Sequence, residues 1–478
     1  MARKKPPAPP KPGQSPSKPR GDLFARMLAA RVSEAHGPGS ASTLDQSPEI
    51  ASPRGFVGVR NIALQRALGV PGIPLGRVTE ISGWPGAGKS TALDQILSQC
   101  QTEGGVGVLA DTERGRNRAY MTALGVQPAS LVWIGGQTVE AMFEEVETLA
   151  RVSSSVNAQA WHEAMKREGL KVPALGTYKY VIFDPAAPKN SKPVVAYSLA
   201  QWTRQHAAAL AEWQEAHGLP ATGVRDGATR TNMRPCVVHA DTVEERKSAL
   251  ADWAAGVTDN PRAQPADRPI VVGWDSVAGT ATEAELEGSS RDVHPATAAK
   301  AIRRNLRRMV QLIDDEAIAL VLVNQRYEKI QMGGGRRSWG PQSETYGGGG
   351  IKYHTTIRIE VDKRGDIYGS GRAKAAGYPP VGQEVVIKVP KNKLNDPYRT
   401  ERYGLVFGQG ACDAWAIHED LKERAIIRAS GGWSRFSDPK IMGDDDKSFR
   451  GWEELRTIMA DNPTIKAELE AIYLEGAV

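Results

Sequence analysis

Cysteine is scarce in this chain, with three residues among 478, and Cys100, Cys236 and Cys412 lie far apart. Structural zinc sites and disulfide frameworks use cysteines at short, paired spacings, so neither is predicted. Aromatic residues make up only 6% of the chain, and no apolar run is long enough for a bilayer-spanning helix. The basic N-terminus lacks the apolar segment of a secretory signal. These absences favour a reduced, cytoplasmic protein that does not act in a membrane.

The length is sufficient for two or three domains, and a hydrophobic content of 40% supports a substantial core. The formal net charge of +6 permits a polyanionic partner but is a mild excess over this length. Residues 1–20 are rich in proline and lysine and are predicted to be a disordered basic arm. Residues 22–35 place apolar side chains at helical spacing, so the predicted helix must pack on its own core or on a neighbouring subunit.

Strand and helix patterns alternate through the middle of the chain. Strands are predicted at 77–82, 106–111, 131–135, 269–274 and 318–325, with helices near 88–97, 116–124, 138–151 and 296–314. Near-continuous apolar strands separated by helices are typical of an α/β fold with a mainly parallel sheet covered on both faces. Three β-rich runs follow at 355–361, 384–393 and 403–407, and the end of the chain has helical patterns at 413–428 and 449–473.

Residues 83–90 form a complete phosphate-binding loop between an apolar strand and a helix. They read Gly83, Trp84, Pro85, Gly86, Ala87, Gly88, Lys89 and Ser90, followed by Thr91. The glycines let backbone N–H groups turn onto a triphosphate, while Lys89 reaches the β- and γ-phosphates and Ser90 offers a hydroxyl to Mg²⁺. The loop predicts that the chain binds a nucleoside triphosphate.

Polar side chains at the ends of predicted strands are candidates for the chemistry. Asp275 closes the apolar run 269–274 and is the expected water-mediated ligand of Mg²⁺, with Asp184 at the end of another apolar run as the alternative. Glu113 follows the strand 106–111, where it could polarise a water or cap a helix at the surface. Gln325 ends the strand 318–325, where its amide could sense the γ-phosphate or bond to backbone.

Two basic features point to single-stranded DNA as a partner. The stretch 326–350 combines cations with glycines and an aromatic side chain, which suits phosphate neutralisation and base stacking. Its candidate contacts are Arg326, Lys329, Arg336, Arg337, Trp339, Gly347 and Gly348. The helix at 296–314 places Lys300, Arg304 and Arg307 along one face. The alternatives are a flexible solvent-exposed loop and a solvated helix face.

In this order the motifs resemble the bacterial RecA recombinase family. The similarity covers about 22–152 and 268–473, with Asp111-Thr-Glu113, Asp275-Ser-Val-Ala and Asn324-Gln325 at the nucleotide motifs of that family. The resemblance implies that Glu113 is the catalytic glutamate and that Gln325 is the γ-phosphate sensor. It also implies that Asn117 and Tyr120 contact adenine.

Further along the chain, the resemblance implies that Lys391 and Lys393 reach the ATP of an adjacent subunit. The fold it implies is a RecA-type phosphate-loop ATPase core with an N-terminal docking helix and a small α+β C-terminal domain. The chain would then divide into the basic arm (1–20), an oligomerisation helix with its linker (21–60), the first part of the core (61–152), an insertion (153–267), the second part with the DNA-binding loops (268–411) and the C-terminal domain (412–478). The insertion has no counterpart and could bind a further partner.

The function implied is that of an ATP- and Mg²⁺-dependent DNA recombinase. Such a protein forms a homo-oligomeric helical filament on single-stranded DNA, pairs it with double-stranded DNA and exchanges strands, in the cytoplasm and on the nucleoid. Two alternatives remain. One is a ring-forming helicase with the same core, and the other is an ATP-gated scaffold or regulator without strand exchange.

Overall fold

In a computed structural model of the chain, the described residues are 22–36, 41, 43–44, 52–150, 180–182, 194–196, 236–238, 263–265, 269–288, 297–328, 343–369, 374–442 and 448–475. The chain separates into two compact units, residues 1–52 with 162–263 and residues 53–161 with 264–478. The first unit contains helix α1 (Asp22–His36), close to its predicted extent, and strands β6 (Tyr180–Ile182), β7 (Val194–Ala196) and β8 (Cys236–Val238). Strand β9 is Ala263–Pro265. The predicted boundaries of the insertion lie outside the described residues.

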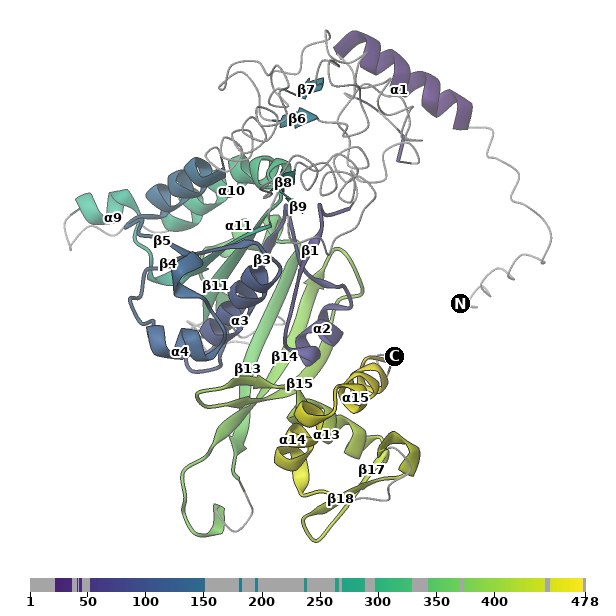
Figure 1. Ribbon diagram of the computed structural model, residues 1–478. Coiled ribbons are helices and arrows are strands. Elements are labelled where there is room, and N and C mark those ends of the chain that lie inside the picture. The colour runs from purple at the N-terminus through teal and green to yellow at the C-terminus, as the bar shows by residue number, and fades with distance from the viewer. Residues whose placement is uncertain are drawn as a thin grey trace, which may run out of the picture. The chain divides into compact units, whose positions relative to one another are not determined.

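A ten-stranded sheet forms the centre of the second unit (Figure 1). Its order is β16–β15–β14–β13–β3–β11–β10–β4–β5, with β12 paired to β11. The strands from β13 to β5 along this order run parallel, and β14, β15 and β16 continue the sheet antiparallel. The mainly parallel α/β sheet predicted from the sequence is confirmed.

The bounds of these strands follow the predicted pattern except that β11, β13 and β15 are longer than predicted and that β12 and β16 were not predicted. The parallel strands are β3 (Val78–Gly83), β4 (Val106–Asp111), β5 (Leu131–Ile134), β10 (Ile270–Asp275), β11 (Ile318–Glu328) and β13 (Ile357–Ile367). The others are β12 (Ser343–Thr345), β14 (Gly382–Asn392), β15 (Arg399–Val406) and β16 (Gly410–Cys412). Strand β11 continues beyond 325 because Arg326–Glu328 pair with β12, and β13 continues beyond 361 because its far end pairs with β14.

Helices bury both faces of the parallel strands. Successive strand residues point to opposite sides of the sheet, so each strand contributes side chains to two cores. Val271 of β10 belongs to a core that includes α3 (Lys89–Thr102) and α2 (Ile62–Leu68). Its neighbours Ile270 and Val272 belong to a second core with the helix at 139–150, α10 (Thr297–Asp315) and α11 (Gly348–His354). Burial on both faces explains why these strands read as continuous apolar runs.

Shorter elements complete the core. Strands β1 (Phe56–Gly58) and β2 (Gly72–Pro74) pair antiparallel, and α4 (Arg118–Ala123) and α9 (Glu283–Glu287) follow β4 and β10. Single turns of 3-10 helix lie at Pro128–Ser130, Val277–Gly279 and Pro439–Met442. Every helix within the described ranges is too short or too polar to serve as a membrane span.

The C-terminal elements, which Figure 1 shows below the long strands, differ from the predicted pattern at two points. The helix predicted at 413–428 ends at Glu423 as α13 (Asp413–Glu423), because Ala425 adopts a φ of 59° and a hairpin of β17 (Ile427–Ser430) and β18 (Trp433–Phe436) begins. The helix predicted at 449–473 is two helices, α14 (Gly451–Asp461) and α15 (Pro463–Glu475). Proline lacks the N–H that would continue α14 and favours the first position of a new helix.

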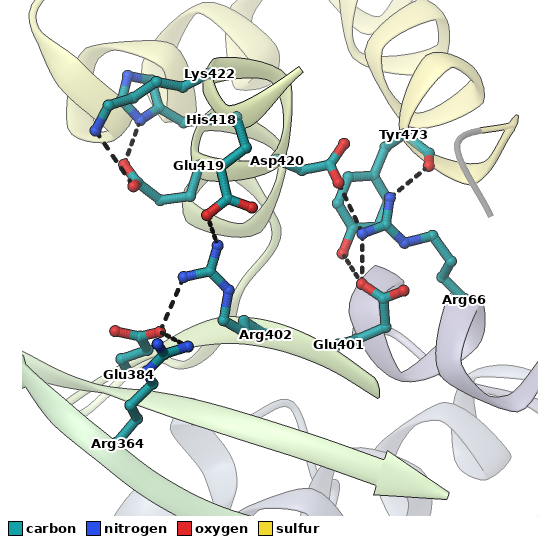
Figure 2. A network of polar contacts seen from close by, with 11 residues as sticks. Arg66, Arg364, Glu384, Glu401, Arg402, His418, Glu419, Asp420, Lys422 and Tyr473 are labelled. Carbon is teal, nitrogen blue, oxygen red and sulfur yellow. Dashed lines mark hydrogen bonds and ion pairs between the residues drawn. The ribbon is translucent and has the colours of Figure 1, made fainter. Parts of the chain in front are cut away.

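A polar network fastens the C-terminal helices to the core (Figure 2). Arg66 on α2 pairs with Glu401 on β15 and, at 2.9 Å, with Asp420 on α13. It also donates to the carbonyl oxygen of Tyr473 on α15 at 2.9 Å and lies 3.6 Å from the centre of that ring. One guanidinium therefore joins four elements that are far apart in the sequence.

Candidate nucleotide site

The phosphate-binding loop connects β3 to α3 at the carboxyl edge of the parallel strands. Gly86 and Gly88 have φ angles of +73° and +94°, which a residue with a side chain adopts only under strain. A Cβ on Gly83 would lie 2.1 Å from the backbone oxygen of Val361 on β13, so no larger residue fits there. The glycines that the sequence placed in this loop are thus required by its geometry.

Polar contacts hold the loop in shape. Lys89 Nζ donates to the carbonyl oxygen of Trp84 at 2.9 Å, and Gln383 Nε2 on β14 donates to the carbonyl oxygen of Gly86 at 2.8 Å. Burial lowers the pKa of Lys89, an effect that the carboxylates of Asp275 and Glu113 oppose. The lysine is therefore buried beside two acids, where a bound phosphate group would find a preformed cation.

Asp275 lies beside Ser90, as expected for a magnesium-binding pair. The Ser90 hydroxyl donates to Asp275 Oδ2 at 2.7 Å. Burial raises the pKa of Asp275, while Arg116 and the Ser90 hydrogen bond oppose the rise. A hydroxyl and a carboxylate in contact are oxygen donors of the kind that Mg²⁺ prefers, so these residues fit the ion. The alternative ligand, Asp184, lies outside the described residues.

Glu113 and Gln325, 212 residues apart, meet at this edge of the sheet. Gln325 Nε2 donates to Glu113 Oε1 at 2.7 Å, and the Ser276 hydroxyl donates to the same oxygen. Gln325 also lies opposite Gly83 in the register of β11 and β3, directly beside the start of the phosphate-binding loop. The Gln325 side chain therefore connects Glu113 to β11, the strand that leads into the 326–350 segment.

Asn117 and Tyr120 lie at the start of α4, beside the first turn of α3. The Asn117 side chain caps α4 by accepting from the Tyr120 N–H at 3.1 Å. The Tyr120 hydroxyl lies 3.1 Å from Thr91 Oγ1, beside the loop. Their contact with adenine stays a prediction.

Within the described residues, the candidate DNA contacts fall into three groups. Lys300, Arg304 and Arg307 are exposed on α10, on the face opposite the buried Ile302 and Leu306. Arg326 is held by both oxygens of Asp362 on β13, at 2.9 and 3.1 Å. Gly347 and Gly348 have positive φ angles of 82° and 61° where α11 begins. The remaining candidates lie outside the described residues: Lys329, Arg336, Arg337 and Trp339. DNA contact stays a prediction for all of them.

Comparison with known proteins gives the family. A model of the RecA N-terminal domain matches residues 27–158 and 266–412, which is more than half of the chain. This chain belongs to the RecA family. Curated relatives include Protein RecA of Salinispora tropica, 22% identical over 449 residues, which cover 94% of this chain and 90% of the relative. Protein RecA of Bifidobacterium longum is 21% identical over 441 residues, 92% of this chain and 77% of the relative. The family match stops at 158 and resumes at 266, so all but the two ends of the predicted insertion (153–267) is unmatched.

Lys391 and Lys393 of this RecA-family chain lie at the opposite end of β14 from the phosphate-binding loop. Lys391 is opposite Arg358, which is in turn opposite Glu80 of β3, whereas Gln383 of the same strand touches the loop. Lys391 is eight residues along the chain from Gln383, which corresponds to roughly 26 Å of strand. Lys391 donates instead to the carbonyl oxygen of Lys352. The two lysines are thus far from the nucleotide site of their own chain.

Arg116 and Asp94 are site residues that the sequence reasoning missed. Arg116 Nη2 lies 2.6 Å from Asp275 Oδ2, its Nη1 donates to the carbonyl oxygen of Ser90 at 3.0 Å, and it pairs with Asp94 on α3. Its own N–H donates to Asp111 Oδ2 at 3.2 Å. A signal was present, because Asp94 lies between Leu93 and Leu97 on the buried side of α3. Buried acids are almost always paired, so a cationic partner was to be expected.

Proposed function

We propose that this chain is an ATP-dependent DNA recombinase that forms helical filaments on single-stranded DNA and carries out homologous pairing and strand exchange. Membership of the RecA family supports a role in recombination and repair. The observation that carries the proposal is the hydrogen bond from Gln325 to Glu113. It connects the residue that would activate water with the strand from which the predicted DNA-binding segment begins.

The nucleotide would be ATP with Mg²⁺. Backbone N–H groups of the loop and the Lys89 ammonium would bind the phosphates, and Ser90 with Asp275 would hold Mg²⁺. When bound, Mg²⁺ supplies positive charge to the phosphate oxygens. Glu113 would orient and deprotonate the attacking water, since its carboxylate is an exposed acceptor held by two donors.

DNA binding would be coupled to nucleotide state through β11. Gln325 contacts Glu113 at one end, and Arg326, the next residue, is anchored to Asp362 on β13. A change at the nucleotide that moves the Gln325 amide would therefore be transmitted to the segment beyond 326. Linkage is reciprocal, so DNA would raise the affinity for ATP by the same factor as ATP raises the affinity for DNA.

Neighbouring subunits would complete each site in the filament. Lys391 and Lys393 lie too far from the loop of their own chain to reach its phosphates, which supports their acting on the ATP of an adjacent subunit. Cations at a phosphoryl-transfer site stabilise the charge that develops in the transition state. Helix α1 has exposed apolar side chains, including Phe24, Met27 and Leu28, which would dock on the neighbour.

Electron microscopy of the full chain with single-stranded DNA and a slowly hydrolysed ATP analogue tests this proposal. Long helical filaments and ATP-dependent strand exchange are expected, and Lys89→Ala should lose both. The matched control Lys422→Ala changes an exposed lysine on α13 and should behave as the unaltered protein. Closed rings that unwind forked DNA would favour the helicase alternative. No assembly in the presence of both ligands would favour the scaffold.

A further inference from the structure

A buried ion cluster contacts the residues that would hold Mg²⁺. The Arg116 side chain is 7% exposed and is shared between Asp94 and Asp275, whose side chains are 2% and 7% exposed. Arg116 is therefore a full positive charge in direct contact with the carboxylate that would face the metal ion. The function proposed above assigns this guanidinium no role.

The contacts of Arg116 place it in competition for Asp275. Asp275 Oδ2 accepts from both the Ser90 hydroxyl at 2.7 Å and Arg116 Nη2 at 2.6 Å. A second cation at the same carboxylate is repelled by the first, and the repulsion is screened only weakly in a buried site. Asp94 offsets this repulsion, because it gives the guanidinium a second carboxylate on α3.

The hydrogen bonding of Arg116 is incomplete, as is that of Arg66. The buried Nε of Arg116 has no acceptor, although buried donors in folded proteins are nearly always satisfied. Burying these three charges costs desolvation free energy that apolar side chains would avoid. These buried charges therefore need an explanation in the function of the candidate nucleotide site that they contact.

We propose that Arg116 is a tethered counter-cation of Asp275 that competes with Mg²⁺ for this carboxylate and so sets the Mg²⁺ concentration at which the site binds MgATP. Asp94 is its positioning partner and draws the guanidinium away from Asp275. This inference rests on the proposed ATP- and Mg²⁺-binding function. The positive charge at position 116 then opposes Mg²⁺ binding, and the negative charge at position 94 favours it.

Two single variants test the effect of each charge on Mg²⁺ binding. Arg116→Met removes the competitor and should lower the Mg²⁺ concentration for half-maximal binding of a fluorescent ATP analogue by about tenfold. Asp94→Asn leaves Arg116 facing Asp275 alone and should raise that concentration by a similar factor. Arg116→Lys keeps the charge and should remain near the unaltered protein. The readout is equilibrium binding without DNA, checked by electron paramagnetic resonance of free Mn²⁺ in place of Mg²⁺.

A purely structural pair predicts a different pattern. Both single variants would then weaken Mg²⁺ binding together with thermal stability, and that result overturns the inference. If Arg116→Met does not fold, the double variant Asp94→Leu with Arg116→Leu takes its place, because it removes the unpaired Asp94 and leaves Asp275 as the remaining charge of the three. The double variant must bind Mg²⁺ at least as tightly as the unaltered protein, and weaker binding also overturns the inference.

The unaltered protein separates this inference from the proposed function. If it binds no ATP analogue at any Mg²⁺ concentration, the proposed function fails and the charge effect has no site to act on. If it binds the analogue with Mg²⁺ but Arg116→Met leaves the half-maximal concentration unchanged, the proposed function stands and the counter-cation role is wrong.

Discussion

Glu113 and Gln325 share one hydrogen bond, and the proposed function gives them separate roles. Glu113→Gln keeps an oxygen acceptor for Ser276 and Gln325 while it removes the negative charge that would activate water. ATP turnover should therefore fall about 10²- to 10⁴-fold, with nucleotide affinity nearly unchanged. Steady-state hydrolysis and equilibrium binding measure the two effects. Glu287→Gln, an exposed change on α9, is the control, and unaltered turnover in Glu113→Gln would contradict the assigned role.

Asp413 links stability to pH. It accepts a hydrogen bond from the Ile62 N–H at 3.0 Å, and burial raises its pKa from 3.8 to about 7, with Glu470 adding to the rise and Lys466 opposing it. The folded protein binds more protons than the unfolded chain between these values, so the contribution of Asp413 to stability is lost as the pH rises through 7.

Asp413→Asn keeps the acceptor and removes the charge. It should raise the free energy of unfolding at pH 8 by on the order of 1–2 kcal/mol and have little effect near pH 4. Urea unfolding at the two pH values measures the difference. An equal effect at both would show that the charge of Asp413 is not the cause.

At the scale of elements, the attachment of the C-terminal helices depends on Arg66. Arg66→Met would leave Glu401 and Asp420 without their shared cation in a largely buried position. Breaking one partner of a buried network costs about 3–5 kcal/mol, so urea unfolding should show a large loss of stability. Figure 2 contains the matched control, Arg402, which bridges Glu384 and the exposed Glu423. Arg402→Met should cost about 1 kcal/mol or less, and equal losses would contradict the special role of Arg66.

At the scale of the whole molecule, the distance between Lys391 and the loop predicts that each active site is shared by two subunits. Lys89→Ala and the double variant Lys391→Ala with Lys393→Ala should each lack DNA-dependent ATP hydrolysis. An equimolar mixture should recover part of it, because some junctions then combine an intact loop with intact lysines. Hydrolysis assays on the separate and mixed proteins test this. No recovery in filaments shown by microscopy to contain both variants would contradict shared sites.

The sequence alone determined the features that depend on neighbours along the chain. The phosphate-binding loop, the buried parallel strands and the exposed basic face of α10 were all predicted, because each is encoded by local spacing and burial. Asp275 at the end of β10 and Glu113 just after β4 lie where the sequence predicted them, since the carboxyl ends of parallel strands meet at one edge of a sheet. Gln325 was predicted to end its strand, but β11 continues to Glu328.

Tertiary structure alone decided which of these residues touch. Arg116 reaches Asp94 and Asp275 across 22 and 159 residues, and the register of β14 places Lys391 at the far edge of the sheet. The hairpin at 427–436 ended a helix that the helical pattern had continued to 428, because pairing between strands outweighs local propensity. Sequence spacing fixes which side of a strand or helix a residue occupies. Contacts between elements depend on register and packing, which the spacing does not contain.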